Sequence, residues 1–414
     1  MPPRITRVRW SASNVPFGVS FNEATGTFSG TPEDTGEYTV PVRVETNYGT
    51  DTKDVVMTVD PPSGLVYAVG SSSEIWSGNA EADANGLRKL NMPNVSRLFE
   101  LSSMMSVPGI YGFGGKTASG MYVCGVSYAD FGLDESFGTA TTPKKFPVDN
   151  VAEMYTLLYW YSSAAQYGNV YRTSGKKLRG VFSIGTGSYS SYIKITDDDD
   201  DIQVATLPKT AGYCHFIAGL SPNNKKEIIA VGVVTKRTIE QERELKAVFG
   251  VSSSNVINPL SSREYACYLT IDGELYIQEC VSGSTPMRVG ADLGQIKDVW
   301  SLGYGYPPDN MYVVTGNNKL YVGNSRTVTT EEIAEVGDFT EVGNFNVKRL
   351  SGYRDLLGDL IFMLTEDGKL YHKGIAVSGV SVSHDSFTQI FHNYSILDMV
   401  YIPRRNTLVM VLEE

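Results

Sequence analysis

A hairpin repeated every 40 to 50 residues constrains the fold of this chain more than any other feature. Each copy has an apolar strand, a polar turn and a second strand with an aromatic or aliphatic centre, often followed by Gly. The aromatic centres are separated by 45 to 50 residues, apart from one gap of 105 residues that spans about two periods. They fall at Trp76, Tyr122, Tyr171, Tyr276, Tyr321 and Tyr371. One hairpin per period of this length predicts an all-β chain containing a β-propeller.

The turns support this interpretation. Asp272-Gly273 and Asp367-Gly368 are dipeptides that two-residue hairpin loops favour, because both loop positions need a positive φ. The chain is also rich in Gly (41) and Tyr (25), which suits many turns joining strands with aromatic side chains. Eight hairpins with seven connectors predict about seven blades, with the terminal strands shared to close the ring.

Two stretches carry a family resemblance. Residues 296–300 lead to 311–315 and 319–323, and residues 347–350 lead to 362–371. This pattern resembles the RCC1 family of propellers in a degenerate form, and the resemblance extends over residues 65–414. The family's His before the Leu-Thr strand and its Gly-Gln-Leu-Gly tail are missing, which argues against its exchange and chromatin roles.

The first sixty residues form a separate module. Short alternating strands flank Ala24–Pro32, which reads ATGTFSGTP, and Gly36–Val40, which reads GEYTV. Residues 10–60 resemble the Ig-like or cadherin-like modules of phage and bacterial surface proteins. The resemblance implies a β-sandwich over residues 1–60 that spaces or docks the protein. A stiff linker at 61–64, rich in Pro, would join it to a propeller at 65–414.

Residues 150–252 fit the repeat poorly. Thr238 can cap a helix over residues 238–249, with Gln241 as the returning partner. The end of this region also resembles laminin-G or concanavalin-like domains, so a jelly-roll lectin insertion is the alternative to two irregular blades.

Charge and composition exclude several classes of function. The formal net charge is −11, which argues against nucleic-acid binding because phosphate contacts need clustered Lys and Arg. No run of 18 apolar residues is present, so we expect no membrane insertion. The N-terminus has no signal-peptide core, and the four cysteines form no CxxC pair, which predicts free thiols and folding in a reducing cytoplasm.

Candidate site residues are few. Aromatic residues in loops could stack on sugar rings, and the candidates for ligand binding are Trp160, Tyr161, Trp300, Tyr304 and Tyr306. The run of aspartates could hold Ca²⁺ through Asp197, Asp199 and Asp201, although it lacks the spacing of a known calcium loop. No catalytic motif is present, so the chain is predicted to be no enzyme and to need no cofactor other than this Ca²⁺.

These features lead to one functional hypothesis and two alternatives. The first is a phage virion accessory protein of the tail, fibre or capsid surface, assembled in the host cytoplasm. It would bind other virion proteins and a host-surface glycan or receptor, and it is compatible with a homo-oligomer. The alternatives are an adhesin or lectin at the bacterial cell surface, and a carbohydrate-active enzyme on a propeller.

Overall fold

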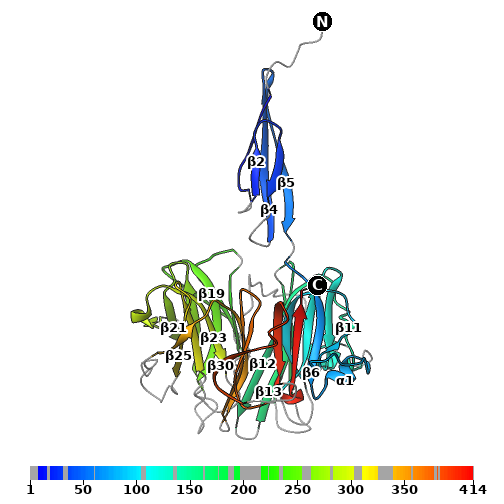
Figure 1. Cartoon of the computed structure of the whole chain (residues 1–414). Coiled ribbons are helices and arrows are strands. Elements are labelled where there is room, and N and C mark those ends of the chain that lie inside the picture. The colour runs from blue at the N-terminus through cyan, green and yellow to red at the C-terminus, as the bar shows by residue number, and fades with distance from the viewer. Residues whose placement is uncertain are drawn as a thin grey trace. The chain divides into compact units, whose positions relative to one another are not determined.

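The computed structural model describes residues 8–413 except 16–18, 31–35, 60, 104–108, 134–137, 162–163, 176, 185–190, 196–215, 222, 233–235, 254–262, 280–282, 303–309, 325–338, 356–357, 377–379 and 381–382. The chain divides into two compact units, Met1–Pro62 and Ser63–Glu414, which Figure 1 colours from blue to red along the sequence. The boundary falls inside the predicted linker, and each unit is described by itself.

The first unit is a small two-sheet module. One sheet has the order β1-β4-β5 and the other pairs β2 with β3. Its strands are β1 (Val8–Ala12), β2 (Val19–Asn22), β3 (Thr27–Gly30), β4 (Gly36–Thr46) and β5 (Gly49–Val59). Gly26 in the β2–β3 turn has a φ of +69° and lies against the ring of Trp10 on β1, so it joins the two sheets. The predicted Ig-like module is confirmed as β structure.

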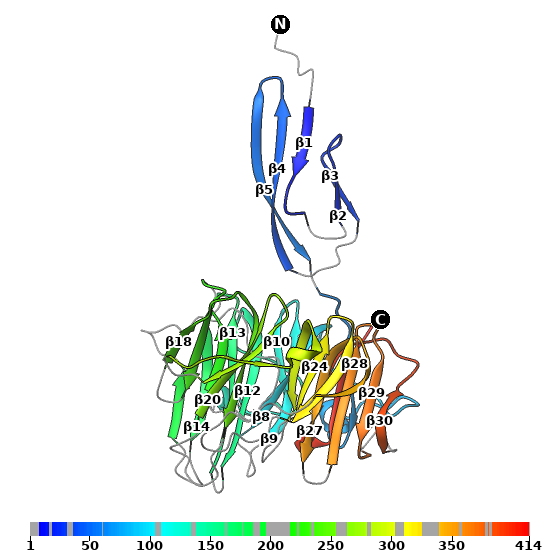
Figure 2. The same cartoon turned by 90° about the vertical axis from the view of Figure 1, so that its left-hand side faces the viewer.

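Six sheets of the second unit use strands that are consecutive in the chain. Figure 2 shows their strands standing beside one another. The first sheet contains β8 (Val95–Ser103), β9 (Gly109–Thr117), β10 (Gly120–Cys124) and β11 (Lys144–Lys145). The second sheet contains β12 (Val151–Tyr161), β13 (Ala164–Thr173), β14 (Leu178–Ile184) and β15 (Ser191–Ile195). The third sheet contains β16 (Phe216–Leu220), β17 (Glu227–Gly232) and β18 (Lys236–Glu240). The fourth sheet contains β19 (Leu245–Ser253), β20 (Arg263–Thr270), β21 (Leu275–Glu279) and β22 (Met287–Val289). The fifth sheet contains β23 (Ile296–Leu302), β24 (Asn310–Thr315), β25 (Lys319–Asn324) and β26 (Thr340–Asn344). The sixth sheet contains β27 (Val347–Asp355), β28 (Gly358–Thr365), β29 (Leu370–Gly374) and β30 (His384–Ile390).

The seventh sheet joins the two ends of this unit. It has the order β31-β32-β6-β7 and so combines C-terminal β31 (Ile396–Ile402) and β32 (Thr407–Leu412) with β6 (Leu65–Gly70) and β7 (Arg88–Lys89). Val409 of β32 pairs with Ala68 of β6. This is the predicted ring closure by terminal strands, and the described residues show seven sheets. The prediction of an all-β chain with a propeller is confirmed.

The first strand of each sheet lies nearest its neighbours: β8 contacts β12 and β31, and β27 contacts β23 and β31. Six of these inner strands have a β-bulge one residue after their start, following Val95, Val151, Leu245, Ile296, Val347 and Ile396. A bulge increases the local twist and redirects the following side chain. The repeated bulge therefore places equivalent side chains at one level of the central ring.

Two expectations for residues 150–252 are wrong. The predicted helix at 238–249 is absent, because Lys236–Glu240 is β18 and Leu245–Ser253 is β19. Ile239 pairs with Ile228, and Val248 pairs with Tyr268. Helix propensity amounts to only a few tenths of a kcal/mol per residue, which pairing and burial at two sheets override. The described strands there form sheets in sequential order, which corrects the alternative of a jelly-roll insertion.

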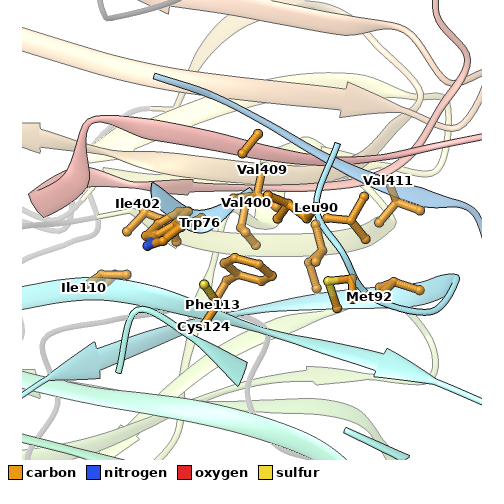
Figure 3. Close-up of a cluster of buried hydrophobic side chains, with 14 residues drawn as sticks. Trp76, Leu90, Met92, Ile110, Phe113, Cys124, Val400, Ile402, Val409 and Val411 are labelled. Atoms are coloured by element: carbon orange, nitrogen blue, oxygen red, sulfur yellow. The ribbon is translucent and has the colours of Figure 1, made fainter. Parts of the chain in front are cut away.

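The cores lie between neighbouring sheets. In Figure 3, Val400, Ile402 and Val409 of the closing sheet face Phe113 and Cys124 of the next sheet. Trp76 belongs to the same cluster, and its ring centroid lies 5.5 Å from that of Phe113. Cys124 and Cys267 are buried free thiols, as expected, and burial raises the pKa of both well above the ordinary value.

Candidate ligand cavity between two sheets

A cavity of about 660 Å³ lies between the closing sheet and the sheet of β8 to β11. It is found where β8 and β10 end, at Ser103 and Gly125. The chain enters the propeller at the other end of β8, because Gly64 pairs with Val95 through hydrogen bonds of 2.9 and 3.1 Å. The cavity therefore opens on the end of the propeller away from the entering chain.

The lining combines apolar, hydroxyl and charged groups from three connections. The one-turn helix α1 (Ser73–Trp76) closes one side, and the 3₁₀ helices η1 (Tyr128–Phe131) and η5 (Pro403–Arg405) contribute to the rest. The lining residues are Ser72, Ile75, Trp76, Ser103, Gly125, Ser127, Ala129, Asp130, Gly138, Thr139, Ala140, Thr141 and Arg405.

The apolar part of the lining comes from α1. Ile75 is 62% exposed, whereas Trp76 is 3% exposed and anchors the helix in the core. Gly125 has a φ of +80°, and a Cβ there would lie 2.6 Å from the Tyr111 carbonyl and 3.1 Å from the Trp76 ring. Only glycine fits this position, so the close approach of backbone and indole at the cavity wall depends on it.

The polar part is held by a capping box. Asp130 Oδ2 accepts a hydrogen bond of 2.9 Å from the Ser127 N–H, and Ser127 Oγ accepts one from the Ala129 N–H. Gly132 ends η1 in the left-handed conformation with a φ of 73°. These bonds fix η1 rigidly at the edge of the cavity.

Two further contacts support the floor and wall. Asn169 Nδ2 donates to the Ser102 carbonyl at 2.8 Å, and Ser102 N–H donates to Thr156 Oγ1, so the sheet of β12 supports the end of β8. The Arg405 guanidinium lies over the Tyr111 ring at 5.4 Å from its centroid, a cation–π contact that positions the charged group at the cavity.

A second polar cluster lies among the inner strands. Asp398 accepts hydrogen bonds from Arg349 at 2.9 Å and from the Leu98 N–H at 2.7 Å, while Arg349 also donates to the Leu98 carbonyl. Ser351 Oγ donates to Glu100 at 2.5 Å. Burial raises the pKa of Glu100, although Arg349 and the Ser351 bond oppose the change. This cluster joins three sheets and has a structural role.

Among the aromatic residues predicted to bind ligand, Trp300 is the one whose side chain the structure describes, and it is not in the lining of the cavity. Trp300 lies on β23 and is 2% exposed within a core cluster, so the prediction that its face is available to a sugar is wrong. Trp160 and Tyr161 are the last residues of β12 and pair with Ala165 and Ala164, so they are strand residues rather than loop residues. Tyr304 and Tyr306 lie outside the described residues.

The predicted Ca²⁺ ligands, Asp197, Asp199 and Asp201, also lie outside the described residues. Within the part of the chain that the structure describes, no group of three or more His, Cys, Asp and Glu side chains is arranged to hold a metal ion. No helix in that same part is long and apolar enough to cross a membrane.

Sequence reasoning missed the residues that line the cavity. They are mostly small, and they come from connections that are distant in the chain, so no local motif marks them. One available signal was the run Ser127-Tyr128-Ala129-Asp130, which has the Ser-x-x-acid spacing of a capping box.

Residues 3–60 match a family model described as "Putative Ig domain". No curated protein matches the chain. Among solved structures, AofleA from Arthrobotrys oligospora has a TM-score of 0.42 at 11% identity, covering 71% of this chain and 87% of that one. A fungal lectin from Aleuria aurantia, described as a six-bladed β-propeller with a fucose recognition mode, has a TM-score of 0.37 at 9% identity, covering 61% and 85%. The second unit of the present chain has seven sheets among its described residues.

Proposed function

We propose that the protein is a non-enzymatic binding protein whose propeller recognises a glycan in the cavity between the closing sheet and the sheet of β8 to β11. The observation that carries the proposal is the lining of this cavity. Its volume of about 660 Å³ lies in the range of ligand sites, and its lining combines hydroxyl groups with apolar side chains. A sugar likewise combines hydroxyl groups with C–H faces.

The position of the cavity supports a role in attachment. It lies at the end of the propeller opposite to Gly64, among the connections between strands, where binding residues are commonly found. Its walls are rigid because η1 is capped at both ends and α1 is anchored by Trp76. A preformed site loses little entropy on binding.

Binding accounts for the described lining better than glycoside cleavage does. Cleavage normally uses two carboxyl groups on either side of the scissile bond. Asp130 is the carboxylate in the described lining, and its Oδ2 accepts the Ser127 N–H. The proposal therefore assigns Asp130 to positioning η1.

We place this binding function in a phage virion, as a tail, fibre or capsid-surface accessory protein. The support is the Ig-like module at residues 3–60 joined to a propeller with a ligand cavity. The module would dock or space the protein on other virion proteins, and the propeller would bind the host surface. A bacterial surface adhesin is the competing placement.

Two experiments test the proposal. A glycan array probed with the whole chain should give a small set of related glycans, and a uniformly blank array would contradict the glycan proposal. Immunogold microscopy of lysate particles with antibody against residues 65–414 should label tails or capsids. Label confined to bacterial envelopes would overturn the virion placement and favour the adhesin.

A further inference from the structure

His372 occupies a position that holds an aliphatic residue in other sheets. It is the third residue of β29, and the equivalent strands carry Val123, Ile277 and Ala68 at this place, after the same apolar-Tyr pair. His372 is 0% exposed, and its ring lies 5.0 Å from that of Phe362. An imidazole has therefore replaced an aliphatic side chain at a core position.

The His372 side chain is buried with its polar atoms unsatisfied. Among the described residues, neither Nδ1 nor Nε2 has a hydrogen-bond partner of acceptable geometry, although the Ile375 backbone lies within electrostatic reach of the ring. A neutral imidazole carries one N–H donor and one acceptor, and burying both without partners is costly. An unsatisfied group of this kind indicates that something else contacts it.

The neighbouring side chain is a second histidine. His384, the first residue of β30, is half-buried, and its ring centroid lies 5.3 Å from that of His372 at an interplanar angle of 73°. When two imidazoles bind one tetrahedral cation at the usual Zn–N distance of about 2.0–2.1 Å, their ring centroids lie about 5 Å apart. The pair thus has the spacing of two ligands on one metal ion.

We propose that His372 and His384 bind a first-row transition-metal cation of the Zn²⁺ or Cu²⁺ class. Imidazole nitrogen suits these metals, whereas Ca²⁺ and Mg²⁺ prefer oxygen. A neutral imidazole offers such a cation the lone pair of its unprotonated nitrogen. Water fills the remaining coordination positions on the half-buried side.

The site is independent of the glycan cavity. Its two ligands lie on the sheet of β27 to β30, whereas the cavity lies between the closing sheet and the sheet of β8 to β11. With two protein ligands rather than three or four, the site binds more weakly than a structural zinc site.

The test uses the whole chain stripped of metal with a chelator. Zn²⁺ should raise the unfolding midpoint of the wild type and bind with one site in calorimetry, and Cu²⁺ should show nitrogen ligation by electron paramagnetic resonance. His372→Val restores the residue type of the other sheets. It should fold, equal or exceed the wild type in stability without metal, and bind Zn²⁺ at least about tenfold more weakly.

His384→Ala and His392→Ala complete the design. His384→Ala should lose the same binding, whereas His392→Ala, at an exposed histidine between β30 and β31, should keep it. A midpoint for the wild type that does not move with Zn²⁺ or Cu²⁺ would overturn the proposal. Equal affinity in the wild type and His372→Val would overturn it too, because the metal would then be bound elsewhere.

Discussion

At the scale of single residues, the inner strands carry charged side chains that are only slightly exposed. Arg349 and Asp398 are paired at 2.9 Å with side chains 19% and 9% exposed. Glu100 lies beside them and is only partly satisfied, since its pKa is raised by burial. The inner strands thus carry both an ion pair and a carboxyl group whose pKa is raised by burial.

Glu100 should give the protein a pH-dependent stability. Because its pKa is higher in the folded protein than the value of 4.5 expected when unfolded, folding is favoured by protonation. This contribution is complete below about pH 4.5 and is lost as the pH rises through the folded pKa. Glu100→Gln should remove this pH-dependent loss of stability and keep an oxygen that accepts the hydrogen bond from Ser351. The variant should be at least as stable as the wild type at pH 7.

Thermal unfolding of both proteins between pH 4 and 8 measures this effect. The difference between their midpoints should grow in favour of Glu100→Gln as the pH rises. Parallel curves, or a variant far less stable at pH 7, would show that the ionised carboxylate is well accommodated.

At the scale of elements, the sequence predicted hairpins better than it predicted connections. A turn does join paired strands at Asp272-Gly273, but the predicted two-residue loop is wrong. Leu269 pairs with Leu275, whereas a two-residue loop there would pair it with Tyr276. Trp76, in contrast, marks a helix turn rather than a strand, and the repeat position of that sheet belongs to Tyr67. The partner of β6 is β32, more than 300 residues away, and no local pattern encodes such a pairing.

The candidate site was harder to predict than the fold for a related reason. Aromatic content suggested sugar-stacking residues, but Trp300 is needed to fill the core between two sheets. The cavity instead forms where small residues such as Ala129 and Gly138 leave space between connections. Space of this kind depends on tertiary packing, so sequence alone could not locate it.

One backbone position on an inner strand accommodates only glycine, and replacing that glycine should lower the stability of the protein. Gly352 on β27 has a φ of +142°, and a Cβ there would lie 2.1 Å from the Leu360 carbonyl oxygen. Gly352→Ala should destabilise the protein by about 3 kcal/mol or more, because a backbone clash adds to the conformational strain.

Gly294→Ala is the matched control. Its φ is +77° and its ψ is −143°, but no atom lies within 4 Å of the added Cβ, so the cost should be that of backbone strain alone, about 1–3 kcal/mol. Denaturant unfolding compares the two variants. Equal losses would mean that strain, rather than the close approach of β27 to β28, determines the effect.

At the scale of the whole molecule, stability depends on closing the ring. The closing sheet brings together strands from both ends of the second unit, and Asp398 ties it to the neighbouring sheets on either side through Arg349 and the Leu98 N–H. The cavity lies between this sheet and the next one, so the proposed binding would depend on ring closure.

Asp398→Ala should show this dependence of stability on ring closure. It leaves Arg349 and the Leu98 N–H buried without Asp398, which should cost about 3–5 kcal/mol. Glu341→Ala, which removes an exposed pair with Lys319 at 2.8 Å, should cost less than about 1 kcal/mol. Denaturant midpoints measure both losses, and similar values would contradict the importance of the Asp398 contacts.

The most direct test of the proposed function fills the cavity and leaves the fold unchanged. Thr139 lies in the lining and is exposed, so Thr139→Trp should occupy the cavity, whereas Thr388→Trp adds the same ring at an exposed strand position elsewhere. The measurement is a titration of the tightest glycan from the array against the wild type and both variants. The account predicts that Thr139→Trp weakens binding at least about tenfold while Thr388→Trp keeps it. Equal affinity in all three proteins would place the glycan outside this cavity and contradict the account.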